Sequence, residues 1–208
     1  LDDKSRTCYK WNVIKASDSS SETVELLLDH DLLGNTAWIS LEDYVSAGGT
    51  TEEYGSYGNN KYGPITALKH LKQATDSWNG VVILTSADSV TRDNASGSTY
   101  TINYEGYKAR LISGQELVDI AGDKEWTPNG NYFLGLPTWV RSNMAISEDM
   151  SDVSDVDFYE HLFYWTDTAR SSNSMSAWFM NIIGVKYTVS YPYSSGVRPV
   201  VKILKSNL

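Results

Sequence analysis

The chain has 208 residues, of which 41% are hydrophobic and 21% are charged, so it can bury a substantial core and an intrinsically disordered chain is excluded. Its net charge of −9 disfavours nucleic acid and anionic membrane surfaces as partners, because both would repel an acidic protein. No apolar run approaches the length of a membrane-spanning helix, so we expect no direct membrane insertion.

The first elements that the sequence predicts are two β-strands joined as a hairpin. Tyr9–Ala16 alternates in hydrophobicity, and Thr23–Asp29 is a second apolar run after a polar turn. The alternation places three residues on one face of the first strand: Tyr9, Trp11 and Val13. The following stretch, Leu32–Gly63, is predicted to be long and irregular. Its Tyr and Gly content is typical of a binding loop, and a plain insertion fits equally well.

A helix is predicted to start at Pro64, which suits the first helical position, and to end near Gly80. Its apolar stripe comprises Ile65, Leu68, Leu71 and Trp78. The segment Val81–Thr101 is predicted to be polar and irregular.

A strand over Tyr107–Ile112 and a second helix over Gln115–Ala121 follow. Ser113 lies three residues before Glu116, which is the spacing of a capping box at a helix N-terminus. The next stretch, Asp123–Val140, is rich in loop-forming residues.

An acidic run, Glu148–Asp157, leads into the C-terminal part of the chain. Its carboxylates suit the oxygen preference of calcium, although it lacks the spaced glycine of an EF-hand. The candidate metal ligands are Asp149, Asp152, Asp155 and Asp157. A solvated acidic loop is the alternative, and no other cofactor is expected.

The block Phe163–Leu204 is predicted to form the antiparallel sheet on which the rest of the chain rests, because its apolar runs are punctuated by Ser, Asn and Gly. The expected strands are Phe163–Trp165, Ser176–Asn181, Lys186–Tyr191 and Val200–Leu204. With the hairpin and the two helices, this predicts one α+β domain over residues 1–208 with segregated helices.

Strand alternation in this block also predicts a contact surface. If Trp178 and Met180 face the core, then Phe179 and its neighbours face outward. The predicted ligand-binding residues are Arg170, Asn173, Met175, Phe179, Asn181, Ile182, Ile183, Lys186, Thr188, Ser190, Tyr191 and Tyr193. The alternative is that the apolar members contact the long middle loop and form core.

Seven landmarks in order resemble an uncharacterised domain family of bacterial surface and extracytoplasmic proteins with a C-type lectin-like fold. The landmarks are Trp11–Ile14, Leu26–His30, Gly63–Pro64, Ala109–Ile112, Tyr164–Thr166, Ala177–Trp178 and Gly196–Val200. The resemblance implies two helices flanking small antiparallel sheets with long irregular loops.

The same architecture resembles two functional groups. One comprises variable proteins diversified by retroelements, including phage tropism determinants, which concentrate binding residues in a similar C-terminal stretch. The other comprises formylglycine-generating enzymes, which often end in a similar Gly-x-Arg-Pro signature. We interpret this signature, Gly196–Pro199, as structural: Arg198 is expected to pair with carboxylate or carbonyl groups and Pro199 to restrict the backbone.

Enzymatic activity is not expected. The formylglycine enzymes depend on a set of cysteines, and the lone Cys8 does not supply it. There is no nucleophile elbow and no nucleotide-binding loop, and His30, His70 and His161 are interpreted as structural. The Glu-Pro-Asn, Gln-Pro-Asp and Trp-Asn-Asp triplets of calcium-dependent lectins are also missing.

The sequence therefore predicts a non-catalytic module that binds a protein or carbohydrate ligand on a cell surface. It would belong to an extracellular, cell-surface or phage-borne protein. The alternative functions are a structural or adhesive module of a larger surface protein and, third, a formylglycine-generating-like enzyme.

Overall fold

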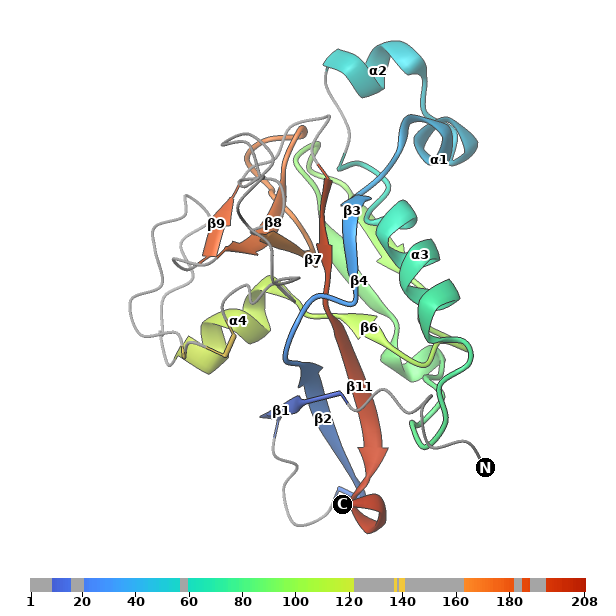
Figure 1. Ribbon diagram of the computed structural model, residues 1–208. Coiled ribbons are helices and arrows are strands. Elements are labelled where there is room, and N and C mark those ends of the chain that lie inside the picture. The colour runs from blue at the N-terminus through green and yellow to red at the C-terminus, as the bar shows by residue number, and fades with distance from the viewer. Residues whose placement is uncertain are drawn as a thin grey trace, which may run out of the picture.

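Two β-sheets carry the fold, with a small separate hairpin and helices around them (Figure 1). The structure is a computed structural model that describes residues 9–15, 21–56, 60–121, 137, 139–140, 163–181, 185–187 and 194–208. The α+β class predicted from the sequence is confirmed. Within these residues, no helix is long and apolar enough to cross a membrane.

The first sheet has the strand order β1-β2-β11-β6. Its strands are β1 (Trp11–Lys15), β2 (Thr23–Leu28), β6 (Arg110–Leu111) and β11 (Pro199–Leu204). The predicted hairpin is confirmed, because β1 and β2 pair antiparallel. The last strand of the chain, β11, lies antiparallel to β2 with Val200 opposite Leu27 and Leu204 opposite Thr23. The C-terminal strand thus lies inside a sheet that the N-terminal hairpin begins.

The second sheet has the order β3-β10-β7-β8-β9. Its strands are β3 (Leu33–Ala37), β7 (Phe163–Ala169), β8 (Ala177–Asn181), β9 (Val185–Tyr187) and β10 (Ser194–Val197). The pairs β7–β8 and β8–β9 are antiparallel, as predicted. The prediction of one wholly antiparallel sheet is wrong: β10, for which no strand was expected, pairs with β7 in parallel, and β11 belongs to the other sheet. Arg198 lies between β10 and β11, so the chain passes from the second sheet to the first at this residue.

The stretch Leu32–Gly63 is not irregular throughout, because it contains β3 and the helices α1 (Leu41–Ser46) and α2 (Thr51–Ser56). Side chains cap both helices. Ser40 accepts a hydrogen bond from the Asp43 amide, while Thr50 and Glu53 each accept one from the other's amide. Helices this short carry no readable apolar period, so the caps were their only sequence signal.

Two further short elements lie in the segment predicted to be irregular, Val81–Thr101. A 3-10 turn (Ser86–Asp88) precedes the antiparallel hairpin of β4 (Val90–Asp93) and β5 (Thr99–Ile102). A bidentate ion pair between Arg92 of β4 and the buried Asp167 of β7, with N–O distances of 3.1 and 2.8 Å, attaches this hairpin to the second sheet. Polar, four-residue strands are hard to distinguish from loops by composition.

The two predicted helices are present with shifted ends. Helix α3 (Ile65–Thr75) begins one residue after Pro64 and ends at Thr75 rather than near Gly80. Trp78 therefore lies beyond the helix and not on its apolar stripe. Helix α4 (Gly114–Ala121) has the predicted capping box: the Ser113 amide donates to the Glu116 carboxylate at 2.8 Å, and the Glu116 amide donates to the Ser113 hydroxyl at 3.1 Å. A final 3-10 turn (Lys205–Asn207) follows β11.

Strand β8 is buried on both faces. Trp178 and Met180 belong to one apolar cluster, as predicted, whereas Phe179 belongs to the other and is 4% exposed. The prediction that Phe179 faces outward is wrong, because this face of β8 also packs into the core: Phe179 and its cross-strand neighbour Trp165 belong to the same buried apolar cluster. The alternative that the apolar member of this face forms core is correct for Phe179.

This double burial predicts that Phe179→Ala and Trp178→Ala are both strongly destabilising. Each removes a nearly fully buried ring, so each should lower the free energy of unfolding by about 3–5 kcal/mol. Denaturant unfolding of the two variants measures this. A loss below about 1 kcal/mol for Phe179→Ala would contradict the covered second face.

Arg198 is fully buried, and its guanidinium donates to three backbone carbonyls. Nε donates to Leu28, Nη1 to Val140 at 3.0 Å and Nη2 to Trp139 at 2.6 Å. The predicted pairing of this arginine with carbonyl groups is confirmed. Gly196 has a separate reason to lack a side chain, since a Cβ atom there would lie 2.3 Å from Oδ2 of Asp31.

Arg198→Lys should destabilise the protein by about 3–5 kcal/mol, because one ammonium cannot satisfy three carbonyls spaced for a guanidinium fork. Denaturant unfolding provides the measurement, and Arg170→Lys, in the half-exposed loop after β7, is the matched control. Equal losses in the two variants would show that the buried fork has no special importance.

Candidate ligand-binding pocket

An aromatic pocket of about 470 Å³ lies over the first sheet, between its strands and the segment that follows α3. Three rings with partly exposed surfaces, those of Tyr9, Trp11 and Trp78, form one part of it. Aliphatic side chains and two amides complete the lining: Leu26, Val81, Val201, Ile203, Asn79 and Asn207, with Gly80. Its size falls in the range of small-molecule sites.

The sheet supplies the apolar side of the pocket through strand alternation. Tyr9 and Trp11 share a face, as predicted, and Leu26 of β2 and Val201 of β11 lie side by side in register. Val13 continues the same alternation and is 53% exposed. The apolar face of this sheet is therefore only partly covered.

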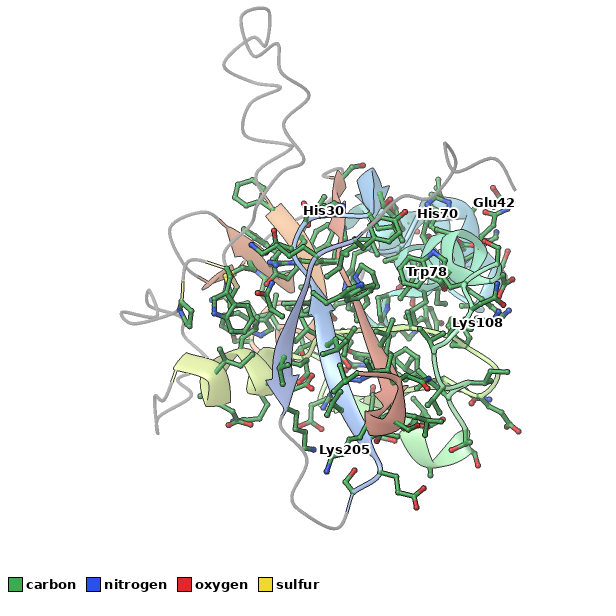
Figure 2. All side chains as sticks on the ribbon, turned by 60° about the horizontal axis from the view of Figure 1, so that its bottom comes forward. His30, Glu42, His70, Trp78, Lys108 and Lys205 are labelled. Atoms are coloured by element: carbon green, nitrogen blue, oxygen red, sulfur yellow. The ribbon has the colours of Figure 1, made fainter. Side chains whose placement is uncertain are left out.

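Two backbone attachments hold the other side of the pocket. The Val82 amide donates to the Lys202 carbonyl at 2.8 Å, which fixes the segment after α3 along β11. The Lys108 ammonium donates to the carbonyls of Asp76 and Trp78 at 2.6 and 2.7 Å. Figure 2 labels Trp78 and Lys108, which lie near each other in that view. Trp78 is thus held in place by its backbone, while its ring remains partly exposed.

The three rings contact one another. The ring centroids are 5.7 Å apart for Trp11 and Trp78, 5.7 Å for Tyr9 and Trp78, and 6.4 Å for Tyr9 and Trp11. The imidazole of His30 packs on the outer side of Tyr9 at 5.8 Å. The interplanar angles are 89° for Trp11 and Trp78, 42° for Tyr9 and Trp78, and 74° for Tyr9 and Trp11, so the rings form one angled aromatic cluster.

The indole N–H groups of this pocket differ from those in the core. Trp38 and Trp165 are buried and donate to the carbonyls of Thr166 and Thr36, at 2.9 and 2.6 Å. Within the described chain, the indole N–H groups of Trp11 and Trp78 donate to no protein acceptor. Two donors are thus available to a ligand.

A second depression of about 490 Å³ lies between α3 and β5. Its cations are already paired: Lys69 lies 3.4 Å from Asp43, and Lys72 lies 2.8 Å from Asp76 and over the ring of Tyr107. We interpret this surface as a solvated helix face rather than a charged ligand site.

The predicted C-terminal contact surface is only partly within the described residues. Arg170, Asn173 and Met175 lie in the loop between β7 and β8, where Asn173 is exposed and the other two are half-buried. The amide of the buried Asn60 orders this loop by donating to the carbonyls of Arg170, Asn173 and Ser176 at 3.0, 2.9 and 2.8 Å.

Two more residues of that surface lie in described strands. Asn181 ends β8 and Lys186 lies in β9, opposite Phe179, which is core. Outside the described residues lie Ile182, Ile183, Thr188, Ser190, Tyr191 and Tyr193. The candidate calcium ligands Asp149, Asp152, Asp155 and Asp157 also lie outside them, as do Cys8 and His161.

The described residues form no group of three His, Cys, Asp or Glu side chains that could hold a metal ion. His30 follows β2 and His70 is exposed on α3, and the two are labelled in Figure 2. The sequence analysis does not predict the aromatic pocket, because it places Trp78 on the apolar stripe of the helix, whereas α3 ends at Thr75 and Trp78 lines the pocket.

Comparisons with family models, with curated proteins and with solved structures find no match to this chain.

Asp31 has a carboxyl group whose pKa is raised in the folded protein. Part of the residue is accessible, yet its Oδ1 atom is buried and has no hydrogen-bond partner. Burial raises the pKa of this carboxyl to about 8, and the charge of Arg198 offsets only part of that effect. Asp31 lines neither pocket. Its side chain packs against the backbone of Gly196, so we interpret it as a structural residue.

A pH dependence of stability follows. In the unfolded chain this carboxyl titrates near a pKa of about 3.9. Between that value and about 8 the folded protein holds a proton that the unfolded chain has released, so the free energy of unfolding should fall as pH rises. The slope should approach about 1.4 kcal/mol per pH unit between roughly pH 5 and 7.5.

Asp31→Asn removes this titration, so the difference in unfolding free energy between wild type and variant isolates it. Carboxyls whose pKa is lowered, such as those of Asp43, Asp88 and Glu116, are ionised in both states across this window and do not contribute. Parallel curves for the two proteins would refute the raised pKa.

Proposed function

We propose that the chain is a non-catalytic ligand-binding module of a surface, secreted or phage-displayed protein, and that the aromatic pocket is a binding site. The carrying observation is the pair Trp11 and Trp78, whose rings are partly exposed and whose indole N–H groups are not used within the described chain. Because the two side chains are only partly buried, a ligand can reach both the rings and these donors. Rigid rings also provide contact area at low cost in conformational entropy.

The lining of the pocket supports binding rather than catalysis. The lining residues that the structure describes include no His, Cys, Ser, Asp, Glu or Lys side chain, so they offer no strong general acid or base and no activated nucleophile. The formylglycine-generating-like activity considered as a third possibility gains no support from this site.

The C-type lectin-like architecture belongs to the same proposal. Supporting features are the small sheets, the flanking helix α3 and the long connections between strands, together with the buried Gly-x-Arg-Pro signature. A second contact surface on the loop of Arg170, Asn173 and Met175, diversified by a retroelement, stays part of the proposal without Phe179. The alternative is a structural or adhesive module in which the pocket is filled by a neighbouring domain.

The test is a binding screen against immobilised glycans and displayed peptides with wild type and Trp78→Ala. At least one ligand retained by the wild type should bind Trp78→Ala about tenfold more weakly, because the ring supplies much of the contact area. Gln73→Ala, an exposed position on α3, is the matched control and should bind like wild type.

Melting curves must first show that Trp78→Ala is folded, and Trp78→Phe serves if it is not. If no ligand is retained, or if every retained ligand binds the folded Trp78 variant as tightly as wild type, the aromatic pocket is not a binding site and the structural or adhesive module is favoured.

A further inference from the structure

We infer that the ligand of the aromatic pocket is a neutral carbohydrate, an inference that rests on the function proposed above. The side chains that line the pocket limit the possible classes of ligand by three properties of the ligand: its charge, its shape and its hydrogen-bonding groups.

The first property is charge. Among the described residues that line the pocket, none carries a charged side chain. The neighbouring cations are engaged elsewhere, with Lys10 at 3.2 Å from Asp29 and Lys202 bound to Asp88. A charged ligand would lose hydration here without gaining an opposite charge, which is unfavourable. Acidic sugars, nucleotides and phosphate esters are therefore poor ligands for this site.

The second property is shape. A cage for an ammonium group needs rings spaced around an empty centre, so that the cation lies over several ring faces. Here the three rings pack against one another, with centroid separations of 5.7, 5.7 and 6.4 Å and two of the three pairs edge-to-face, so neighbouring rings cover part of the faces that a cage would turn to a cation. The partly exposed rings border the pocket together with the aliphatic side chains of Val201 and Ile203, and a ring-shaped ligand can pack there.

The third property is hydrogen bonding. The amides of Asn79 and Asn207 are exposed at the pocket and offer both donors and acceptors, and the two indoles add donors. A purely apolar ligand would leave these groups desolvated and unpaired, which costs free energy. Gly80 has a φ of 80° and open space around its Cβ position, so no side chain of its own blocks the rim.

A neutral sugar has the matching combination. One face of a pyranose ring is formed by C–H groups and packs against aromatic surfaces, while its hydroxyl groups point to the sides and both donate and accept hydrogen bonds. Hydrocarbon chains lack the hydroxyl edge, and choline-like groups carry a positive charge that the described lining residues do not match with an opposite charge. Among the classes that the proposed function allows, a neutral glycan fits the lining of this pocket best.

The experiment titrates the full chain with neutral oligosaccharides of glucose, mannose, galactose and N-acetylglucosamine, with sialyllactose, with choline, and with a proline- and aromatic-rich peptide. Isothermal titration and tryptophan fluorescence report binding. At least one neutral sugar should bind, and raising sodium chloride should leave its affinity unchanged.

The variants separate the groups of the site. Trp78→Ala should weaken the binding of that sugar about tenfold or more, Trp78→Phe should retain part of it, and Asn79→Ala should weaken it severalfold. Gln73→Ala is the control and should not change it. Saturation-transfer NMR should place the C–H protons of the sugar, rather than its hydroxyl edge, next to the aromatic rings.

The outcomes distinguish this inference from the proposed function. If only sialyllactose, choline or the peptide binds, and does so through Trp78, the neutral-sugar inference is overturned while the ligand-binding function stands. If neutral sugars bind equally well to folded Trp78→Ala, or if nothing binds, both the inference and the assignment of this pocket fail.

Discussion

The buried guanidinium of Arg198 is the interaction on which the arrangement of the two sheets depends. It follows β10 of the second sheet directly, and it donates to Leu28 at the end of β2 in the first sheet and to Trp139 and Val140. One side chain thus joins three separate parts of the chain. Because its surroundings exclude water, a neutral or shorter side chain would leave carbonyl groups unpaired, which makes the arrangement nearly all-or-none.

The hydrogen bonds of Arg198 also help to position the aromatic pocket. Pro199 follows Arg198 and begins β11 opposite Leu111, where a missing amide is tolerated at the start of a strand. The register between β11 and β2 then places Val201 beside Leu26, and the Lys202 carbonyl holds the segment that carries Trp78 through Val82. The pocket is therefore a consequence of where the last strand enters the first sheet.

The sequence predicted those elements whose signal is local. Alternation identified the first hairpin and placed Tyr9 and Trp11 on one face, and the capping box of Ser113 located α4. The sequence does not reveal which sheet contains β11, because β11 and its partner β2 are separated by more than a hundred residues and such pairing leaves no local pattern. Alternation also separates the faces of a strand without showing whether the second face is covered, which is why Phe179 was misplaced.

The tryptophans show how one residue type serves two purposes in this chain. Trp38 of the segment after β3 and Trp165 of β7 exchange hydrogen bonds with the backbone at Thr166 and Thr36, so the two indoles connect strands that β10 separates. Their indole N–H groups are therefore hydrogen-bonded within the protein. Trp11 and Trp78 stabilise each other by an edge-to-face contact, which involves their rings but leaves both N–H groups unused. Packing and internal hydrogen bonds account for the first pair, whereas the second keeps donors that no acceptor within the described residues uses.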